Sequence, residues 1–223
     1  MKKTFLTTIA VCLSLALTSC GGGDSGPVQF VTQILSDPYY DGDIRKDSVT
    51  GAYTVTQGMT PSVQSVFAGK DPATGDEYRA FLDFPLSGAG GVPGSAYIVS
   101  ATLDIVMNNI YFYPAITTIP IRIDLVSFLP PDLLSSGIDF DRTLQPALAS
   151  ITISPPISQS DFGQHVAVDV TSLMVEAQRL GLPDFQVRIL EDVGTTAHGL
   201  IEINDTTGPY QDVLAPMLEV TYR

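Results

Sequence analysis

Tryptophan, cysteine and histidine are all scarce in this chain of 223 residues, which has none, two and two of them respectively. Neither His165 nor His198 stands in a nucleophile elbow, an H-E-x-x-H zinc motif or a glycine-rich phosphate loop. His198 and Glu202 are four residues apart, which on a strand separates them by about 13 Å, too far for one metal ion. We therefore expect no histidine-based site and a protein that is not an enzyme.

Basic side chains are also few. The chain has 11 Lys and Arg against 24 Asp and Glu, a formal net charge of −13. Removing a leader that contains Lys2 and Lys3 and no acidic residue leaves nine basic residues and a charge of −15. Such an acidic surface repels nucleic acid and anionic lipid headgroups. We therefore expect no nucleic-acid partner.

Long hydrophobic runs are absent from the sequence as well. The longest apolar segment, Phe5 to Leu17, is shorter than the roughly 20 residues that span a bilayer. It follows Lys2 and Lys3 and precedes small residues, the arrangement of a secretory signal peptide. Residues 1–19 are therefore predicted to be an export signal.

The leader ends in Leu17-Thr18-Ser19-Cys20, which resembles the lipobox of bacterial lipoproteins. That resemblance implies lipidation of Cys20 and a membrane anchor made of acyl chains; a signal peptide that merely contains a cysteine is the alternative. Residues 20–29 include the run GGGDSG and would form the lipidated cysteine and a flexible tether. Gly21 in place of Asp implies, by the same resemblance, an outer-membrane location, on the periplasmic side or the cell surface. Cys12 would leave with the leader, so the mature chain could form no internal disulfide.

Alternation of apolar and polar residues dominates the rest of the sequence. In residues 78–84, 119–125, 165–170, 185–189 and 218–222 every second residue is apolar, which predicts strands with one buried and one wet face. Further strands are expected at 30–35, 52–56, 64–68, 98–107 and 200–204. About ten strands between Gly- and Pro-rich turns predict one all-β jelly-roll sandwich over residues 30–223. One short helix is expected at 171–180, ending at Gly181 and covering an open end of the sandwich.

Four segments in order resemble the DNRLRE-type domains, which are grouped with disaggregatase-related carbohydrate-binding modules of the CBM96 kind. They are RAFLDFPL at 79–86, IVSATLDI at 98–105, VDVTSLM at 168–174 and APMLEVTY at 215–222. The resemblance covers roughly residues 35–223 and implies a jelly roll that binds carbohydrate. Pro85 replaces an Asp of the first motif, and Phe140 is a candidate for the place of the family's usual Trp. The net charge argues against an acidic polysaccharide as ligand.

Two acidic loops suggest a calcium site. Ca²⁺ takes six to eight oxygen ligands, and two acidic loops at one end of a jelly roll could supply them. The alternative is that these residues cap turns and keep the surface soluble. The candidate ligands are Asp37, Asp41, Asp43, Asn204, Asp205 and Asp212.

Paired tyrosines suggest a carbohydrate-binding surface. Aromatic faces pack on the C–H surfaces of sugars, and in a strand one of two adjacent side chains must face outward. The alternative is that these rings fill core or turn positions. The candidates are Tyr39, Tyr40, Tyr111 and Tyr113.

The sequence therefore predicts a lipid-anchored, exported cell-envelope protein whose non-catalytic β-sandwich binds carbohydrate. A structural or adhesive envelope protein that binds other proteins is the first alternative. A glycan-active hydrolase is the second, because carboxylates are abundant although the sequence singles out no pair of them.

Overall fold

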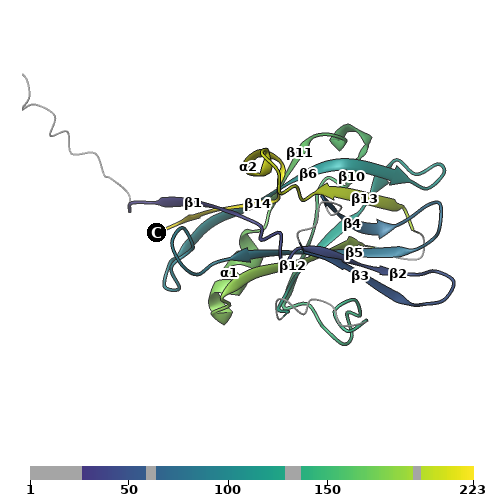
Figure 1. The fold of residues 1–223 in the computed structure, drawn as a ribbon. Coiled ribbons are helices and arrows are strands. Elements are labelled where there is room, and N and C mark those ends of the chain that lie inside the picture. The colour runs from purple at the N-terminus through teal and green to yellow at the C-terminus, as the bar shows by residue number, and fades with distance from the viewer. Residues whose placement is uncertain (1–26, 59–63, 129–136, 193–196) are drawn as a thin grey trace, which may run out of the picture.

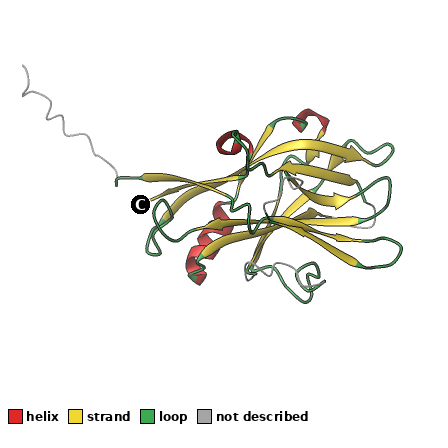
Figure 2. Cartoon of the chain, in the orientation of Figure 1, coloured by secondary structure: helices red, strands yellow, loops and turns green. Residues whose placement is uncertain are grey.

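The computed structural model describes residues 27–58, 64–128, 137–192 and 197–223, which form fourteen strands and three short helices (Figure 1, Figure 2). The all-β prediction is confirmed. The helices are η1 (Gln159–Asp161), α1 (Thr171–Leu180) and α2 (Gln211–Leu214). The strands are β1 (Phe30–Leu35), β2 (Gly42–Lys46), β3 (Tyr53–Gln57), β4 (Ser65–Lys70), β5 (Glu77–Pro85), β6 (Ile98–Phe112), β7 (Thr118–Ile119), β8 (Ile121–Val126), β9 (Ala149–Thr152), β10 (Ile157–Ser158), β11 (His165–Asp169), β12 (Asp184–Glu191), β13 (Gly199–Asn204) and β14 (Met217–Tyr222).

Twelve of these strands form one curled antiparallel sheet. Its order is β1-β14-β6-β13-β4-β5-β12-β8-β9, with β11 paired to β6 and the β2–β3 hairpin paired to β5. The sheet folds over into two layers, with β6 and β13 in the upper layer and β2, β3, β5 and β12 in the lower layer of Figure 1. Strands β7 and β10 form a separate pair.

Strand β6 connects the two parts of the curled sheet. Its first part pairs with β14 and β11, and its last part pairs with β13. The pairing with β13 shifts register between Glu202 and Ile203, so that Asn108 is an extra residue on β6. Such a bulge bends the strand and redirects its side chains.

The predicted alternation fills the space between the layers. Ala80, Leu82 and Phe84 of β5 lie fully buried in one cluster with Val187 and Ile189 of β12. Helix α1 has the predicted bounds and buries Leu173, Met174 and Ala177, and Gly181 ends it in the left-handed conformation at φ 65°. Burial of this apolar surface is the main stabilising term, because a chain with two cysteines has little scope for disulfide crosslinks.

One expectation about the outer surface is wrong. Alternation in β8 predicted that Arg122 and Asp124 lie on a wet face, but Asp124 is fully buried. A second apolar cluster of Ile44, Phe81, Val126, Phe128 and Phe140 lies apart from the main core. The outer face of this layer is thus covered near residues 139–145, whose backbone carbonyls accept hydrogen bonds from buried Arg188. A covering loop cannot be recognised from the alternation of the strand beneath it.

Candidate functional site

Two adjoining hollows that share Ser65 and Phe67 of β4 form a depression lined by polar and aromatic side chains. We call them together the β4 cleft. The first, of about 300 Å³, lies between β4 and the β2–β3 hairpin; the second, of about 550 Å³, extends over β13 and β6. The lining side chains are Asp43, Arg45, Thr54, Thr56, Gln64, Ser65, Phe67, Tyr78, Asn108, Glu202, Asn204, Thr206 and Leu214.

Strand pairing places these side chains together. Val66 and Ala68 of β4 point into the core, so Ser65 and Phe67 point outward. Opposite them on β13 lie Asn204 and Glu202. Directly opposed residues of an antiparallel pair share a face, so four residues of two strands line one surface.

A chain of hydrogen bonds holds the polar side of the cleft. Asn204 Nδ2 donates to Asn108 Oδ1 at 2.8 Å. Asn108 Nδ2 in turn donates to Ser65 Oγ at 2.8 Å, and Ser65 Oγ donates to Glu202 Oε1 at 2.8 Å. The bulge in β6 is what brings Asn108 into this chain. Side chains fixed in this way lose little further freedom when they bind a ligand.

The opposite side of the cleft combines an aromatic pair with a carboxyl group. The rings of Phe67 and Tyr78 lie 5.7 Å apart at 53°. The Phe67 N–H donates to Asp43 Oδ2 at 3.3 Å. Burial raises the pKa of Asp43 to about 7, against the opposing effects of that N–H and of Arg45. Near neutral pH this carboxyl can therefore either donate or accept a hydrogen bond.

Of the four predicted tyrosines, only Tyr111 reaches this region. Its hydroxyl donates to Glu202 Oε2 at 3.4 Å, and burial and Glu202 raise its pKa. The Tyr113 hydroxyl donates to the Asp71 carbonyl instead. Tyr39 is exposed in the turn after β1, beside Tyr40. In the described part of the chain, no ring contact or hydrogen bond joins the two tyrosine pairs into one surface.

The six predicted calcium ligands separate into three places. Asp43 and Asn204 line the β4 cleft, and Asp212 is exposed on α2. Asp41 and Asp205 lie side by side and buried, and Asp37 is close enough to raise the pKa of Asp205. Within the described ranges, no group of three or more His, Cys, Asp or Glu side chains is arranged to hold a metal ion.

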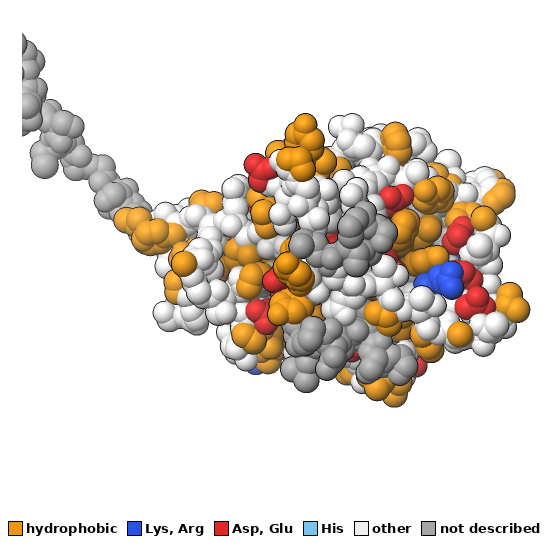
Figure 3. Space-filling view, viewed as in Figure 1, with side chains coloured by type: hydrophobic (Ala, Val, Ile, Leu, Met, Phe, Trp, Pro, Cys, Tyr) orange, Lys and Arg blue, Asp and Glu red, His pale blue; other side chains and the backbone are white. Residues whose placement is uncertain are grey.

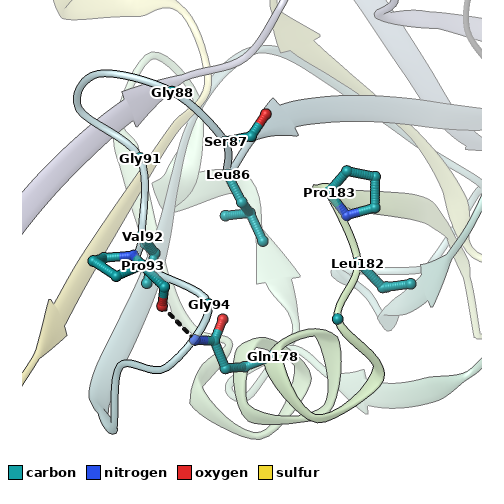
Figure 4. Close-up of a pocket in the computed structure, with 11 residues that line it drawn as sticks. Leu86, Ser87, Gly88, Gly91, Val92, Pro93, Gly94, Gln178, Leu182 and Pro183 are labelled. Carbon is teal, nitrogen blue, oxygen red and sulfur yellow. Dashed lines mark hydrogen bonds between the residues drawn. The ribbon is translucent and has the colours of Figure 1, made fainter.

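A third hollow, of about 330 Å³, lies between the glycine-rich loop after β5 and the end of α1 (Figure 4). Gln178 Nε2 donates to the Pro93 carbonyl at 2.6 Å and so ties the helix to the loop. Leu86, Val92 and Leu182 also line it, and none of its lining residues is charged or aromatic. This hollow therefore has fewer side chains that could recognise a ligand or take part in catalysis than the β4 cleft has.

Sequence reasoning missed most of the cleft. Phe67, Tyr78 and Glu202 lie within predicted strands, and Asn108 lies one residue past the end of the strand predicted at 98–107; none was assigned a role. One local signal was available: Phe67 lies between Val66 and Ala68, so burial of these two residues turns the Phe67 ring to the opposite face of β4. The predicted lipidation site, Cys20, lies outside the described residues, and in the part of the chain that is described no helix is long and apolar enough to cross a membrane.

Comparison with protein-family models gave no match for this chain, and comparison with curated proteins gave none either. The fold and the cleft therefore define its class: an all-β protein with a polar, aromatic-lined cleft over β4.

Proposed function

We propose that this chain is a lipid-anchored, exported cell-envelope protein whose β-sandwich binds carbohydrate in the β4 cleft without catalysis. The observation that carries the proposal is the pairing of the Phe67 and Tyr78 rings with a fixed chain of amide, hydroxyl and carboxylate groups. Export and anchoring are supported by the leader and by the lipobox resemblance at Cys20. The DNRLRE-type resemblance supports carbohydrate as the ligand.

The two sides of the cleft suit the two kinds of surface on a sugar. An aromatic ring packs against the apolar C–H face of a pyranose, while amide and carboxyl groups bond its hydroxyls. Phe67 lies between these groups: its N–H contacts Asp43, and Glu202 is its cross-strand partner. One sugar residue seated on Phe67 would therefore meet polar groups on both sides.

Charge favours a neutral glycan over an acidic one. Arg45 is the one basic residue among those that line the cleft, against the carboxyl groups of Asp43 and Glu202. Acidic side chains are also spread over the face shown in Figure 3, with basic ones mostly gathered in one small area. An anionic polysaccharide would therefore meet an excess of negative charge on this chain.

Glycan binding by the full chain, purified in detergent, tests the proposal. A glycan array followed by affinity electrophoresis with the polysaccharides that bind should identify a neutral ligand. Phe67→Ala should weaken its binding about tenfold or more, because an aromatic contact of ~1.5 kcal/mol is lost. Tyr97→Ala is the matched control, since Tyr97 is an exposed ring that precedes β6, at the end of that strand away from Asn108.

Two results would overturn the proposal. One is the absence of binding to any neutral or acidic glycan; crosslinking on intact cells that then captured a specific protein partner would favour the adhesive alternative. The other is equal weakening by Phe67→Ala and Tyr97→Ala, which would place the ligand outside the cleft.

Hydrolysis needs a separate test, because Asp43 and Glu202 are two carboxyl groups in one cleft. Glycosidases use such a pair, one as acid and one as base or nucleophile. We expect no new reducing ends when the bound glycan is incubated with the chain. Release of reducing ends that Glu202→Gln abolishes would make the protein a hydrolase.

A further inference from the structure

The buried carboxyl groups of Asp41 and Asp205 meet at a junction of three chain segments. Asp41 ends the connection from β1 to β2, and Asp205 follows the last residue of β13. Ser36, which begins that same connection, donates its N–H to the Pro216 carbonyl just before β14 at 2.9 Å. Their exposed fractions are 0% for Asp41, 2% for Asp205 and 3% for Ser36.

Each of these three side chains has an oxygen without a hydrogen-bond partner. They are Asp41 Oδ2, Asp205 Oδ1 and Ser36 Oγ. The other Asp41 oxygen, Oδ1, is held by the Asp83 N–H at 2.7 Å. The Ser36 hydroxyl lies close enough to lower the pKa of Asp41, although it makes no hydrogen bond of acceptable geometry. Unpartnered buried oxygens are costly, so several in one place call for a bound cation or for a proton that Asp41 and Asp205 share.

Charge identifies what kind of group that is. None of the salt bridges in the described part of the chain involves Asp41 or Asp205. The two side chains are in direct contact with each other, so two negative charges would repel, and burial leaves little water to offset that repulsion. Two buried carboxylates without a basic partner are stable only when a cation or a proton lies between them.

We propose that a calcium ion binds between Asp41 and Asp205, with the Ser36 hydroxyl beside it. All of the free atoms are hard oxygens, a set that suits Ca²⁺ and Mg²⁺ better than zinc, which usually takes nitrogen or sulfur ligands as well. Two carboxylates leave most of the coordination sphere to backbone carbonyls and water; Ca²⁺ tolerates irregular geometry in such a site, whereas Mg²⁺ needs a near-octahedral one. The ion would join the β1–β2 connection to the end of β13.

This proposal is narrower than the acidic-loop prediction and independent of glycan binding. It excludes Asp212 and places Asp43 and Asn204 in the cleft rather than on the ion. Asp41 and Asp205 adjoin those cleft residues along the chain without lining the cleft themselves. The two proposals rest on different side chains and are tested by different measurements.

Calorimetric titration of the full chain with CaCl₂, after treatment with EDTA and exchange into metal-free buffer, tests the site. We expect one calcium ion per chain, a higher thermal midpoint with calcium, and weaker binding of MgCl₂. Asp205→Asn should lower calcium affinity about tenfold or more, because one of two charged ligands is lost. Asp212→Asn removes an exposed carboxylate of the same kind and should leave calcium binding unchanged.

The wild-type titration alone can overturn the proposal, so the test does not depend on whether a variant folds. No heat and no shift of the thermal midpoint with calcium would mean that the two carboxyl groups share a proton. Calcium binding that Asp205→Asn leaves at full affinity would place the ion elsewhere and would equally reject this site.

Discussion

Arg188 donates a hydrogen bond from Nη2 to Asp124 Oδ2 at 2.8 Å, and both side chains are fully buried. Through Nη1, Arg188 also donates to the carbonyls of Asp139 and Gln145. Asp124 further accepts from Arg122 at 2.7 Å and lies 3.3 Å from Arg142. This ion pair therefore fastens the segment near residues 139–145 to the outer face of β8 and β12.

Removing the arginine should strongly destabilise the fold. Arg188→Met leaves Asp124 buried with weaker compensation, and breaking a buried pair by removing one partner costs about 3–5 kcal/mol. Urea unfolding followed by circular dichroism measures the change. Arg179→Met, at an exposed ion pair with Glu176 on α1, is the control and should leave stability nearly unchanged. Equal stability of the two variants would show that the buried pair does not fasten the segment.

Acid should remove part of this stabilisation. Burial acts to raise the pKa of Asp124, but hydrogen bonds from Ser150, Arg188 and Arg122 outweigh it, so the pKa is lowered. A carboxyl whose pKa is lower in the folded than in the unfolded chain stabilises the fold at pH values above its unfolded pKa of about 3.9. That stabilisation is lost as the pH falls through the folded pKa. The stability gap between wild type and Asp124→Asn should therefore be constant from about pH 5 to 8 and narrow below about pH 4. Unfolding free energies measured across that range test this; a gap that keeps its size in acid contradicts it.

The bulge residue should matter for binding more than for folding. Asn108→Ala breaks the chain of hydrogen bonds between Asn204 and Ser65 at the partly exposed floor of the cleft. We expect about tenfold weaker glycan binding, because one bridging amide is lost. Affinity electrophoresis with the identified glycan measures the loss, and a thermal midpoint close to that of wild type shows that the fold is intact. Unchanged affinity would remove Asn108 from the site.

Lipidation should depend on one atom, the Cys20 sulfur. Cys20→Ala should abolish labelling by a radioactive fatty acid and move the protein from the membrane fraction to the soluble fraction. Cys12→Ala is the control, because it removes the other thiol and should leave labelling intact. Labelling that persists in the Cys20 variant would refute the anchor.

Local patterns predicted the strands and the main helix well. Alternation is a property of a few consecutive residues, so it located β1, β5, β11, β12 and β14 to within one or two residues. It missed β2, because Gly42 to Lys46 was interpreted as part of an acidic loop, and it also missed the short strands β9 and β10. It ended β6 at residue 107, because nothing local indicates that the strand continues past a bulge to Phe112.

The candidate sites were harder to predict, because they depend on contacts between distant parts of the chain. The two acidic segments do converge, as expected from their places in a sandwich. Asp41 points inward against Asp205, while Asp43, two residues later on β2, points into the cleft. Side chains two residues apart on a regular strand share a face. Asp41 precedes β2 rather than belonging to it, and this difference is invisible in the sequence.

The sequence by itself determined the acidic charge, the all-β class and the helix at 171–180, and it alone supports the predicted leader and Cys20 as its lipidation site. Each of these depends on composition or on the periodicity of neighbouring residues, which no distant contact can change. Only the tertiary structure decided that Asp124 and Arg188 are buried, that Asp41 meets Asp205, and that Phe67, Asn108 and Glu202 line one cleft. Burial and proximity arise from register, bulges and covering loops, and these are set by packing between segments far apart in the chain.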